Sequence, residues 1–202
     1  MPIDAEVVRV RADDPRARAV LADLEREYDE RYGDAWGEPA SAELDRYPIE
    51  EFAAPDGAFL VLVRDGEVVA GGAFRRFDAS TSELKRIWTS AAHRRQGLAR
   101  RIVAELEHES RRLGYGTVYL TTGPAQPEAH RLYLATGYTP LFDVALTPEE
   151  VVVHGFAKSL TEAPLDRERI QRGHDEALAE FFATLPDGGA GLRAPSPAEV
   201  AR

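Results

Sequence analysis

Hydrophobic and polar residues follow two different periods along this chain, and each change of period marks the border of an expected element. Alternation of apolar and polar residues, or a short apolar run, predicts strands over residues 5–11, 58–63, 67–74, 81–89, 117–121, 139–145 and 151–158. Apolar residues spaced by three or four predict helices over residues 15–32, 41–46, 97–113, 126–136 and 165–185. Three strands follow one another without a long helix between them, so the order predicts an α+β fold with a mixed sheet rather than a doubly wound one.

Glycine, proline and aspartate sharpen several of these borders. Asp65-Gly66 predicts a tight hairpin turn, because both residues tolerate a positive φ. Gly71-Gly72, inside the following strand, indicates a bulge or the close approach of another segment. Gly114 is expected to end the long helix. Asp13 or Asp14 is the expected cap of the first helix.

The character of the chain changes after Leu160. Residues 1–160 are expected to form one domain, and residues 161–202 a C-terminal extension. The helix predicted over 165–185 would pack either on its own domain or on a second subunit, and the second case would make a homodimer. Glycine and proline gather over 187–202, where the composition predicts disorder.

Composition and charge narrow the classes of function. The chain of 202 residues has a net charge of −10, 44% hydrophobic residues and no cysteine. The negative charge argues against a nucleic-acid partner and would attract a cationic acceptor. No apolar run reaches the ~18–20 residues of a membrane span, and the first residues lack the pattern of a signal peptide. We therefore expect a cytoplasmic protein with no membrane partner. The five histidines show no metal-ligand spacing, so neither a metal site nor a catalytic histidine is expected.

The stretch Arg94-Arg95-Gln96-Gly97-Leu98-Ala99 lies between a predicted strand and a predicted helix. The first N–H groups of a helix have no intrahelical partner and the helix dipole is positive there, so this position attracts an anion. Gly97 lacks the Cβ that would keep a phosphate away from the backbone, and nearby arginines add positive charge. The P-loop and the dinucleotide-binding glycine pattern are both absent. A nucleotide-like diphosphate would therefore be held by a loop of another kind.

Arg94-x-x-Gly97-x-Ala99 resembles the Arg/Gln-x-x-Gly-x-Gly/Ala signature of the GNAT superfamily of N-acetyltransferases. Residues 83–89 resemble the family's central strand, and residues 120–138 resemble its second conserved block. The resemblance covers roughly residues 3–160. It implies a GNAT-like, mostly antiparallel central sheet flanked by helices, to which the C-terminal extension is added.

The resemblance also implies acetyl-CoA as the co-substrate and direct attack of an amine on its thioester. Main-chain groups of Ile87, Trp88 and Thr89 would hydrogen-bond the pantetheine arm like an added strand. The pyrophosphate would be bound by the loop and the start of the helix, which comprise Arg94, Arg95, Gln96, Gly97, Leu98, Ala99 and Arg100.

Glu83 and Tyr133 are the candidate catalytic residues. Glu83 would take the proton of an ammonium group, directly or through water; otherwise it is an ion-paired glutamate on a strand. The resemblance places Tyr133 where the family's tyrosine protonates the departing thiolate. The alternative for Tyr133 is a buried ring that packs a short helix on the sheet.

The sequence leaves the acceptor open. Thr121 stands where relatives often carry an acidic residue, and Gln126 where many carry asparagine. In the family the first helices wall the acceptor site; here that region contains Tyr28, Asp29, Glu30, Tyr32, Asp34 and Trp36, a set that would also suit an ordinary polar loop. Three functions fit: acetylation of a small-molecule amine, acetylation of a protein or peptide amine, and a non-catalytic acyl-CoA-binding regulator. The presence of both Glu83 and Tyr133 favours an enzyme, and we expect the acceptor to be a small-molecule amine.

Overall fold

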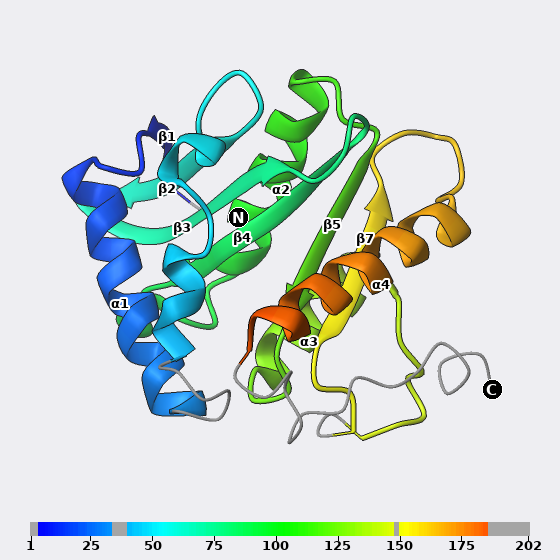
Figure 1. Ribbon diagram of the computed structural model, residues 1–202. Coiled ribbons are helices and arrows are strands. Elements are labelled where there is room, and N and C mark those ends of the chain that lie inside the picture. Colours follow the sequence, from blue (N-terminus) through cyan, green and yellow to red (C-terminus); the bar gives the residue numbers. More distant parts are fainter. Residues whose placement is uncertain (1–3, 34–39, 148–149, 186–202) are drawn as a thin grey trace.

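A computed structural model describes residues 4–33, 40–147 and 150–185 of the chain. Seven strands form one sheet in the order β1-β2-β3-β4-β5-β7-β6 (Figure 1). Only β4 and β5 pair in parallel, and the other pairs are antiparallel. The strands are β1 (Glu6–Val10), β2 (Ala58–Arg64), β3 (Glu67–Arg76), β4 (Thr81–Thr89), β5 (Thr117–Thr122), β6 (Thr139–Pro140) and β7 (His154–Ser159). The mixed, mostly antiparallel sheet expected from the sequence is confirmed.

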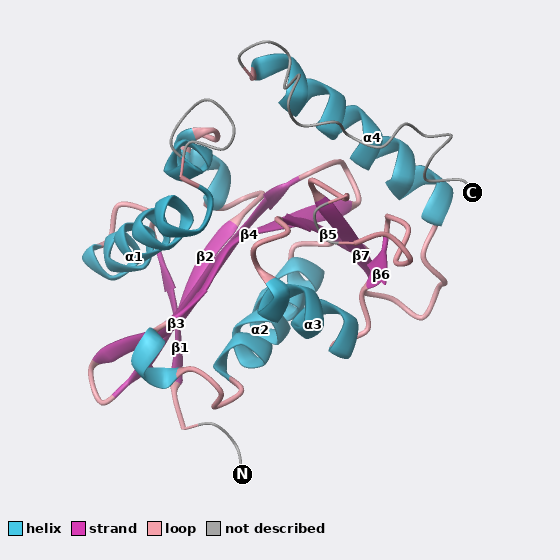
Figure 2. Ribbon diagram, turned by 90° about the horizontal axis from the view of Figure 1, so that it is seen from below, coloured by secondary structure: helices cyan, strands magenta, loops and turns pink. Residues whose placement is uncertain are grey.

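Helices cover both faces of this sheet. Figure 2 shows α1 (Pro15–Tyr32) and α4 (Arg167–Thr184) on one face, and α2 (Leu98–Arg112) and α3 (Pro127–Ala135) on the other. Three short 3-10 segments complete the described structure: η1 (Ala40–Asp45), η2 (Ile49–Phe52) and η3 (Ala91–His93). Within the described ranges, no helix is both long enough and apolar enough to cross a membrane.

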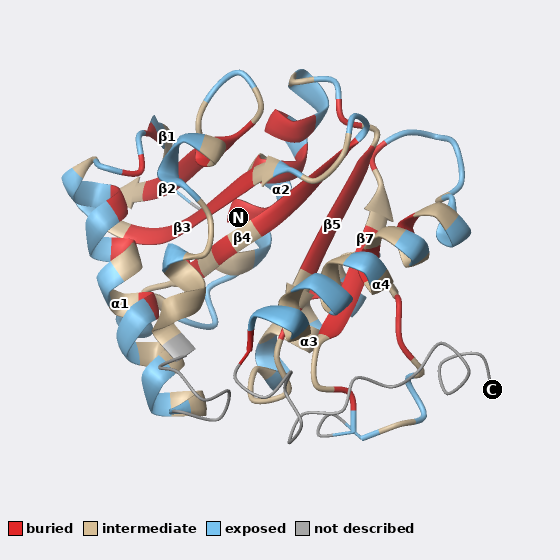
Figure 3. Ribbon diagram, viewed as in Figure 1, coloured by how far each residue is buried: buried red, intermediate tan, exposed pale blue. Residues whose placement is uncertain are grey.

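Two apolar layers hold the helices on the sheet, and the strands between them are buried (Figure 3). Along β2, Leu60 and Leu62 pack toward α2, whereas Phe59 and Val61 pack toward α1. A strand covered on both faces needs apolar residues at successive positions, which explains the unbroken apolar run of β2. Each fully buried side chain of this size contributes about 1.5–3 kcal/mol relative to an exposed one.

The turn signals in the sequence act as predicted. Asp65 and Gly66 have φ values of 51° and 82°, so the β2–β3 hairpin has two left-handed turn residues. The side chain of Asp14 caps α1 by accepting from the N–H of Arg16 at 2.9 Å. A β-bulge lies opposite Gly72, whose missing Cβ would come within 2.8 Å of both Ile87 and Leu106. Both readings of the glycine pair, a bulge and a close approach, are therefore confirmed.

The predicted strand over residues 139–145 is wrong in its length. β6 ends at Pro140, although the N–H of Leu141 still donates to the carbonyl of Gly155 at 2.9 Å. Asp143 then accepts from the N–H of Ala145 at 2.8 Å, and this local turn diverts the chain. β7 likewise begins at His154 rather than at residue 151. Leu141, Phe142 and Val151 are buried although they lie in loops, and the pattern of apolar residues does not distinguish such positions from strand positions.

The helix predicted after Leu160 is present as α4 and packs on its own chain. Ile170 of α4 is fully buried in a small cluster with Tyr119, Leu141 and Ala157. Residues 187–202, where disorder was predicted, lie outside the described part of the chain, as do Asp34 and Trp36.

Candidate active site

The parallel strands β4 and β5 separate toward their carboxyl ends. They pair from Thr81 with Thr117 to Leu84 with Leu120, yet β4 continues to Thr89 and β5 to Thr122. Beyond Leu84, the edge of β4 that faces β5 has no strand partner. A cavity of about 1390 Å³ opens here. Its lining includes the three β4 residues that were expected to bind a pantetheine arm: Ile87, Trp88 and Thr89.

The cavity has two sides, which we name by what lines them. The loop side consists of residues 87–100 and the facing parts of β5 and α3. The ion-pair side consists of η1 and the segment after it, the facing parts of β3 and β4 with the turn between them, and α4.

On the loop side, α2 begins directly at the cavity. Gly97 is its N-cap with a φ of 81°, in the left-handed region, where glycine has no steric cost. Leu98, Ala99 and Arg100, the first helical residues, line the cavity. Their N–H groups have no intrahelical acceptor. The helix start therefore offers unpaired donors and a positive dipole to an anion.

The arginines of this loop differ in their pairing. Arg94 forms an ion pair with Glu27 at 3.0 Å. Arg95 and Arg100 line the cavity and, within the described residues, have no ion-pair partner. The side chain of Gln96 accepts a hydrogen bond from Arg64 at 2.8 Å, and Gln96 does not line the cavity. Of the seven predicted pyrophosphate residues, the structure brings six to the cavity and turns the Gln96 side chain elsewhere.

Glu83 lies on the ion-pair side, where its side chain is 4% exposed. Its Oε2 accepts from Nε of Arg75 at 2.8 Å, and its Oε1 lies 3.2 Å from Nζ of Lys85. Each carboxylate oxygen has a second lone pair that these contacts leave available. Glu83 is thus an ion-paired strand residue that also faces the cavity, so both sequence interpretations describe part of its environment.

Lys85 links this carboxylate to the segment at η1. Its Nζ donates to Oε1 of Glu43 at 2.9 Å. Burial alone would lower the pKa of Lys85, but the carboxylates of Glu43 and Glu83 outweigh that effect and hold the pKa well above its ordinary value. Lys85 therefore stays charged at neutral pH and is not a base.

Tyr133 reaches the cavity from α3. The residue is 4% exposed, and its ring packs against the rings of Tyr138 and Phe156 at centroid distances of 5.4 Å and 5.5 Å. Burial raises the pKa of its hydroxyl, so this group stays protonated at neutral pH. The ring packs the helix on the sheet, as one interpretation expected, and it also lines the cavity.

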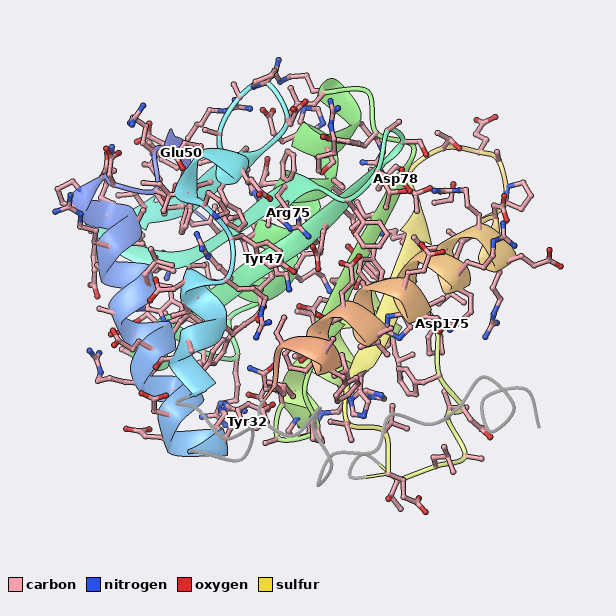
Figure 4. All side chains as sticks on the ribbon, viewed as in Figure 1. Tyr32, Tyr47, Glu50, Arg75, Asp78 and Asp175 are labelled. Carbon is pink, nitrogen blue, oxygen red and sulfur yellow. The ribbon has the colours of Figure 1, made fainter. Side chains whose placement is uncertain are left out.

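Aromatic and charged groups gather on the ion-pair side. The guanidinium of Arg75 stacks over the ring of Tyr47 at 3.8 Å, and Figure 4 shows these two residues side by side between η1 and α4. The Nζ of Lys85 lies 5.1 Å from the same ring. Of the residues named earlier for an acceptor wall, Tyr28 and Tyr32 line the cavity, whereas Asp29 and Glu30 do not.

Sequence reasoning did not find the ion-pair network around Glu83. One signal for it was available, because Glu83 and Lys85 are two apart on a strand and share a face. The position of Arg75 opposite Glu83 depends on the β3–β4 register, which the sequence did not predict. The contribution of α4 to the cavity was also not predicted. Among the described residues, no group of three or more His, Asp or Glu side chains is arranged to hold a metal ion.

Comparisons with known proteins agree with this architecture. The sequence model of the acetyltransferase (GNAT) family matches residues 21–138. A protein of Azospirillum brasilense named IAA acetyltransferase is 30% identical over 132 residues, which are 65% of this chain and 84% of that protein.

Two solved structures share the fold. One is PaiA N-acetyltransferase from Thermoplasma acidophilum in complex with coenzyme A, with a TM-score of 0.58 and 14% identity over 78% of this chain and 99% of that chain. The other is a GNAT family acetyltransferase from Elizabethkingia anophelis with acetyl-CoA bound, with a TM-score of 0.54 and 13% identity over 77% of this chain and 98% of that chain. Because the family match spans more than half of the chain, and the mostly antiparallel sheet and the glycine-capped helix agree with the sequence resemblance, this protein is an acyltransferase that belongs to the GNAT acetyltransferase family.

Proposed function

We propose that this enzyme transfers the acetyl group of acetyl-CoA to a primary amine of a small molecule, by direct attack in a ternary complex. The observation that carries the proposal is the shared cavity, which brings Glu83, Tyr133 and the start of α2 to one space between parted strands. Bound there, acetyl-CoA would supply an activated thioester carbonyl.

The residues of the loop side suit coenzyme A. The helix N–H groups without an intrahelical acceptor complement a diphosphate, and so do Arg95 and Arg100, which have no ion-pair partner in the part of the chain that the structure describes. The free edge of β4 at Ile87 and Trp88 offers main-chain groups to the amides of a pantetheine arm. The buried hydroxyl of Thr89 has no hydrogen-bond partner among the described residues, which is a further polar group available to a ligand.

Glu83 is the proposed base. An alkylammonium with a pKa of ~10.4 is almost entirely charged at neutral pH, so it must lose a proton before it attacks. Because Oε2 of Glu83 already accepts from Arg75 and Oε1 is ion-paired with Lys85, we propose that the proton travels through a water bound to the remaining lone pairs. Arg75 and Lys85 hold the carboxylate in place while this happens.

Tyr133 is the proposed acid. The amine nitrogen bonds to the acetyl carbon, the carbon–sulfur bond breaks, and the proton of the Tyr133 hydroxyl passes to the sulfur. Solvent then returns the proton held at Glu83 to Tyr133. The raised pKa of Tyr133 keeps the proton in place until the sulfur carries charge.

The charges on the ion-pair side support a cationic acceptor. Glu176 and Glu180 of α4 line the cavity with no ion-pair partner within the described ranges, so two carboxylates there are available to an ammonium group, although Arg86 and Arg172 line the cavity equally without an ion pair. Opposite charge of this kind raises the local concentration of an ammonium compound.

A screen of small-molecule and peptide amines for thiol release from acetyl-CoA tests the proposal, and Glu83→Gln sharpens it. With the best acceptor, kcat/KM should fall about 100-fold at pH 7 and recover as the pH approaches the pKa of the amine, because the amine then deprotonates in solution. Glu51→Gln is the control, since Glu51 also binds Arg75, at 2.9 Å, but does not line the cavity. An equal loss at every pH would show that Glu83 is structural, and no turnover of any amine would contradict the proposed reaction.

A further inference from the structure

The helix α4 turns one continuous face toward the cavity. Arg169, Gly173, Ala177 and Phe181 all line it. Their spacing of four residues places them along one side of an α-helix. Ala177 is half-buried near the middle of this face and carries the smallest side chain there after glycine. Ala179, two residues further on, is exposed and does not line the cavity.

Two glycines fit α4 closely to the sheet. A Cβ on Gly155 of β7 would come within 2.6 Å of the His174 ring, so the missing side chain makes room for that histidine. A Cβ on Gly173 would come within 2.9 Å of the Phe77 ring, so the helix in turn makes room for the β3–β4 turn. His174 also shares a hydrogen bond of 2.7 Å with the hydroxyl of Tyr119. These matched contacts fix α4 in one position over β5 and β7.

The helix is held at both ends, by two segments that lie far apart in the sequence. Near its start, Arg169 forms an ion pair with Asp78 in the β3–β4 turn at 2.5 Å. At its end, Arg46, which follows η1, donates to the hydroxyl of Thr184 at 3.2 Å and lies over the Phe181 ring at 4.6 Å. The helix therefore spans the ion-pair side from the β3–β4 turn to the segment at η1. Figure 1 shows α4 running in front of β5 and β7, which agrees with this course.

We propose that α4 is the wall of the acceptor site that limits the size of the acceptor, with Ala177 as a specificity-determining residue. The inference rests on the proposed function and narrows it to compact small-molecule amines. A lysine on a folded protein must carry its neighbouring chain to the thioester. A helix held at both ends across the ion-pair side, which is the acceptor side in this proposal, leaves little room for that chain. Small amines do not meet this obstacle.

The test uses coenzyme A conjugates that need no known acceptor. In each probe the sulfur of coenzyme A is joined by a –CH2–CO–NH– bridge to an amine, which directs the amine part into the acceptor side. Three probes carry methylamine, 2-phenylethylamine, or the lysine side chain of a ten-residue peptide. Dissociation constants for free coenzyme A and the three probes are measured by calorimetry on the full chain and on Ala177→Trp and Ala179→Trp.

The wild type should bind the phenylethyl probe at least 10-fold more tightly than the peptide probe. Ala177→Trp should raise the dissociation constant of the phenylethyl probe at least 10-fold, because the added indole fills only the acceptor side. The dissociation constants of coenzyme A and of the methylamine probe should not change. Ala179→Trp should change none of them. Equal affinities of Ala177→Trp and Ala179→Trp for the phenylethyl probe, or a peptide probe bound as tightly as the phenylethyl probe, would overturn the role of α4. Failure of free coenzyme A to bind the wild type would instead overturn the proposed function itself.

Discussion

The loop side and the ion-pair side of the cavity are built in different ways. The loop side comes mostly from one continuous stretch, residues 87–100, and it offers main-chain groups of a strand edge and a helix start. The ion-pair side brings together residues as distant in sequence as Glu43, Arg75, Lys85 and Phe181. Its groups are side chains that hold one another through ion pairs and stacking.

This difference has a physical consequence. Main-chain donors at a helix start depend on the local backbone, so the loop side needs only a glycine and a helix signal. Ion pairs between distant segments depend on strand register and helix docking, so the ion-pair side exists only in the folded protein. We therefore expect substitutions on the loop side to change ligand binding, and those around α4 to change stability first.

The largest expected effect comes from Gly97→Glu. A side chain at this left-handed position strains the loop, and its carboxylate would occupy the place of a phosphate. The Kd of acetyl-CoA should rise by at least about 1,000-fold, which corresponds to ~4 kcal/mol. Gly114→Glu is the matched control, because Gly114 follows the other end of α2 with a φ of 95°. Equal affinities of the two variants for acetyl-CoA in calorimetry would contradict the placement of the diphosphate.

The next effect concerns pH and α4. Burial lowers the pKa of His174 to about 4, from an ordinary value of 6.5. Between these pH values His174 is protonated in the unfolded chain and neutral in the folded chain. The contribution of His174 to stability is therefore complete above pH 6.5 and is lost as the pH falls toward 4. We expect the free energy of unfolding to decrease by roughly 3 kcal/mol over this window through His174 alone.

Denaturant titrations at pH 7 and pH 4 measure this effect. His174→Gln should remove most of the pH dependence, whereas His108→Gln, at an exposed position on α2, should keep it. If both variants lost stability between pH 7 and pH 4 as the wild type does, the interpretation of His174 as a buried neutral histidine on α4 would be wrong.

Tyr133→Phe tests the proposed acid, which lies on α3 and lines the same cavity as Glu83. Removing only the hydroxyl should lower kcat about 100-fold, because the thiolate then leaves without an acid. The Kd of coenzyme A should not change, since the ring still packs on Tyr138 and Phe156. Tyr138→Phe is the control, because Tyr138 is equally buried but does not line the cavity. A parallel loss of coenzyme A binding in Tyr133→Phe would favour a structural role for the residue.

The smallest expected effect is that of Gly155→Ala. The new methyl group would press on the His174 ring and displace α4 slightly, which should cost about 2 kcal/mol of unfolding free energy. Gly116→Ala is the control, since its Cβ would meet Thr161 at an ordinary 3.7 Å. Thermal unfolding should show a lower Tm only for Gly155→Ala, with the Kd of coenzyme A unchanged in both. Equal Tm values would show that α4 is not closely fitted at this point.

Local patterns were sufficient for most elements and for the loop side. The boundaries of β4 match the prediction, and those of α2 differ by one residue at each end, because alternation and helical spacing there are long and end at clear signals. The strand predicted over residues 139–145 was too long because apolar residues that anchor a loop follow the same period as those of a strand. The orientation of the Gln96 side chain could not be predicted from the sequence either, because it depends on a hydrogen bond from Arg64 on a distant strand.

The sequence by itself determined the family resemblance, the order of elements and the glycine-capped start of α2, because each of these depends on neighbouring residues. The tertiary structure alone decided that Arg75 and Lys85 would hold Glu83, that Tyr133 would share a cavity with it, and that α4 would lie across the ion-pair side. The reason is physical: pairing register, ion pairs and helix docking are contacts between segments far apart in the chain, and their geometry is fixed only when the whole sheet has formed.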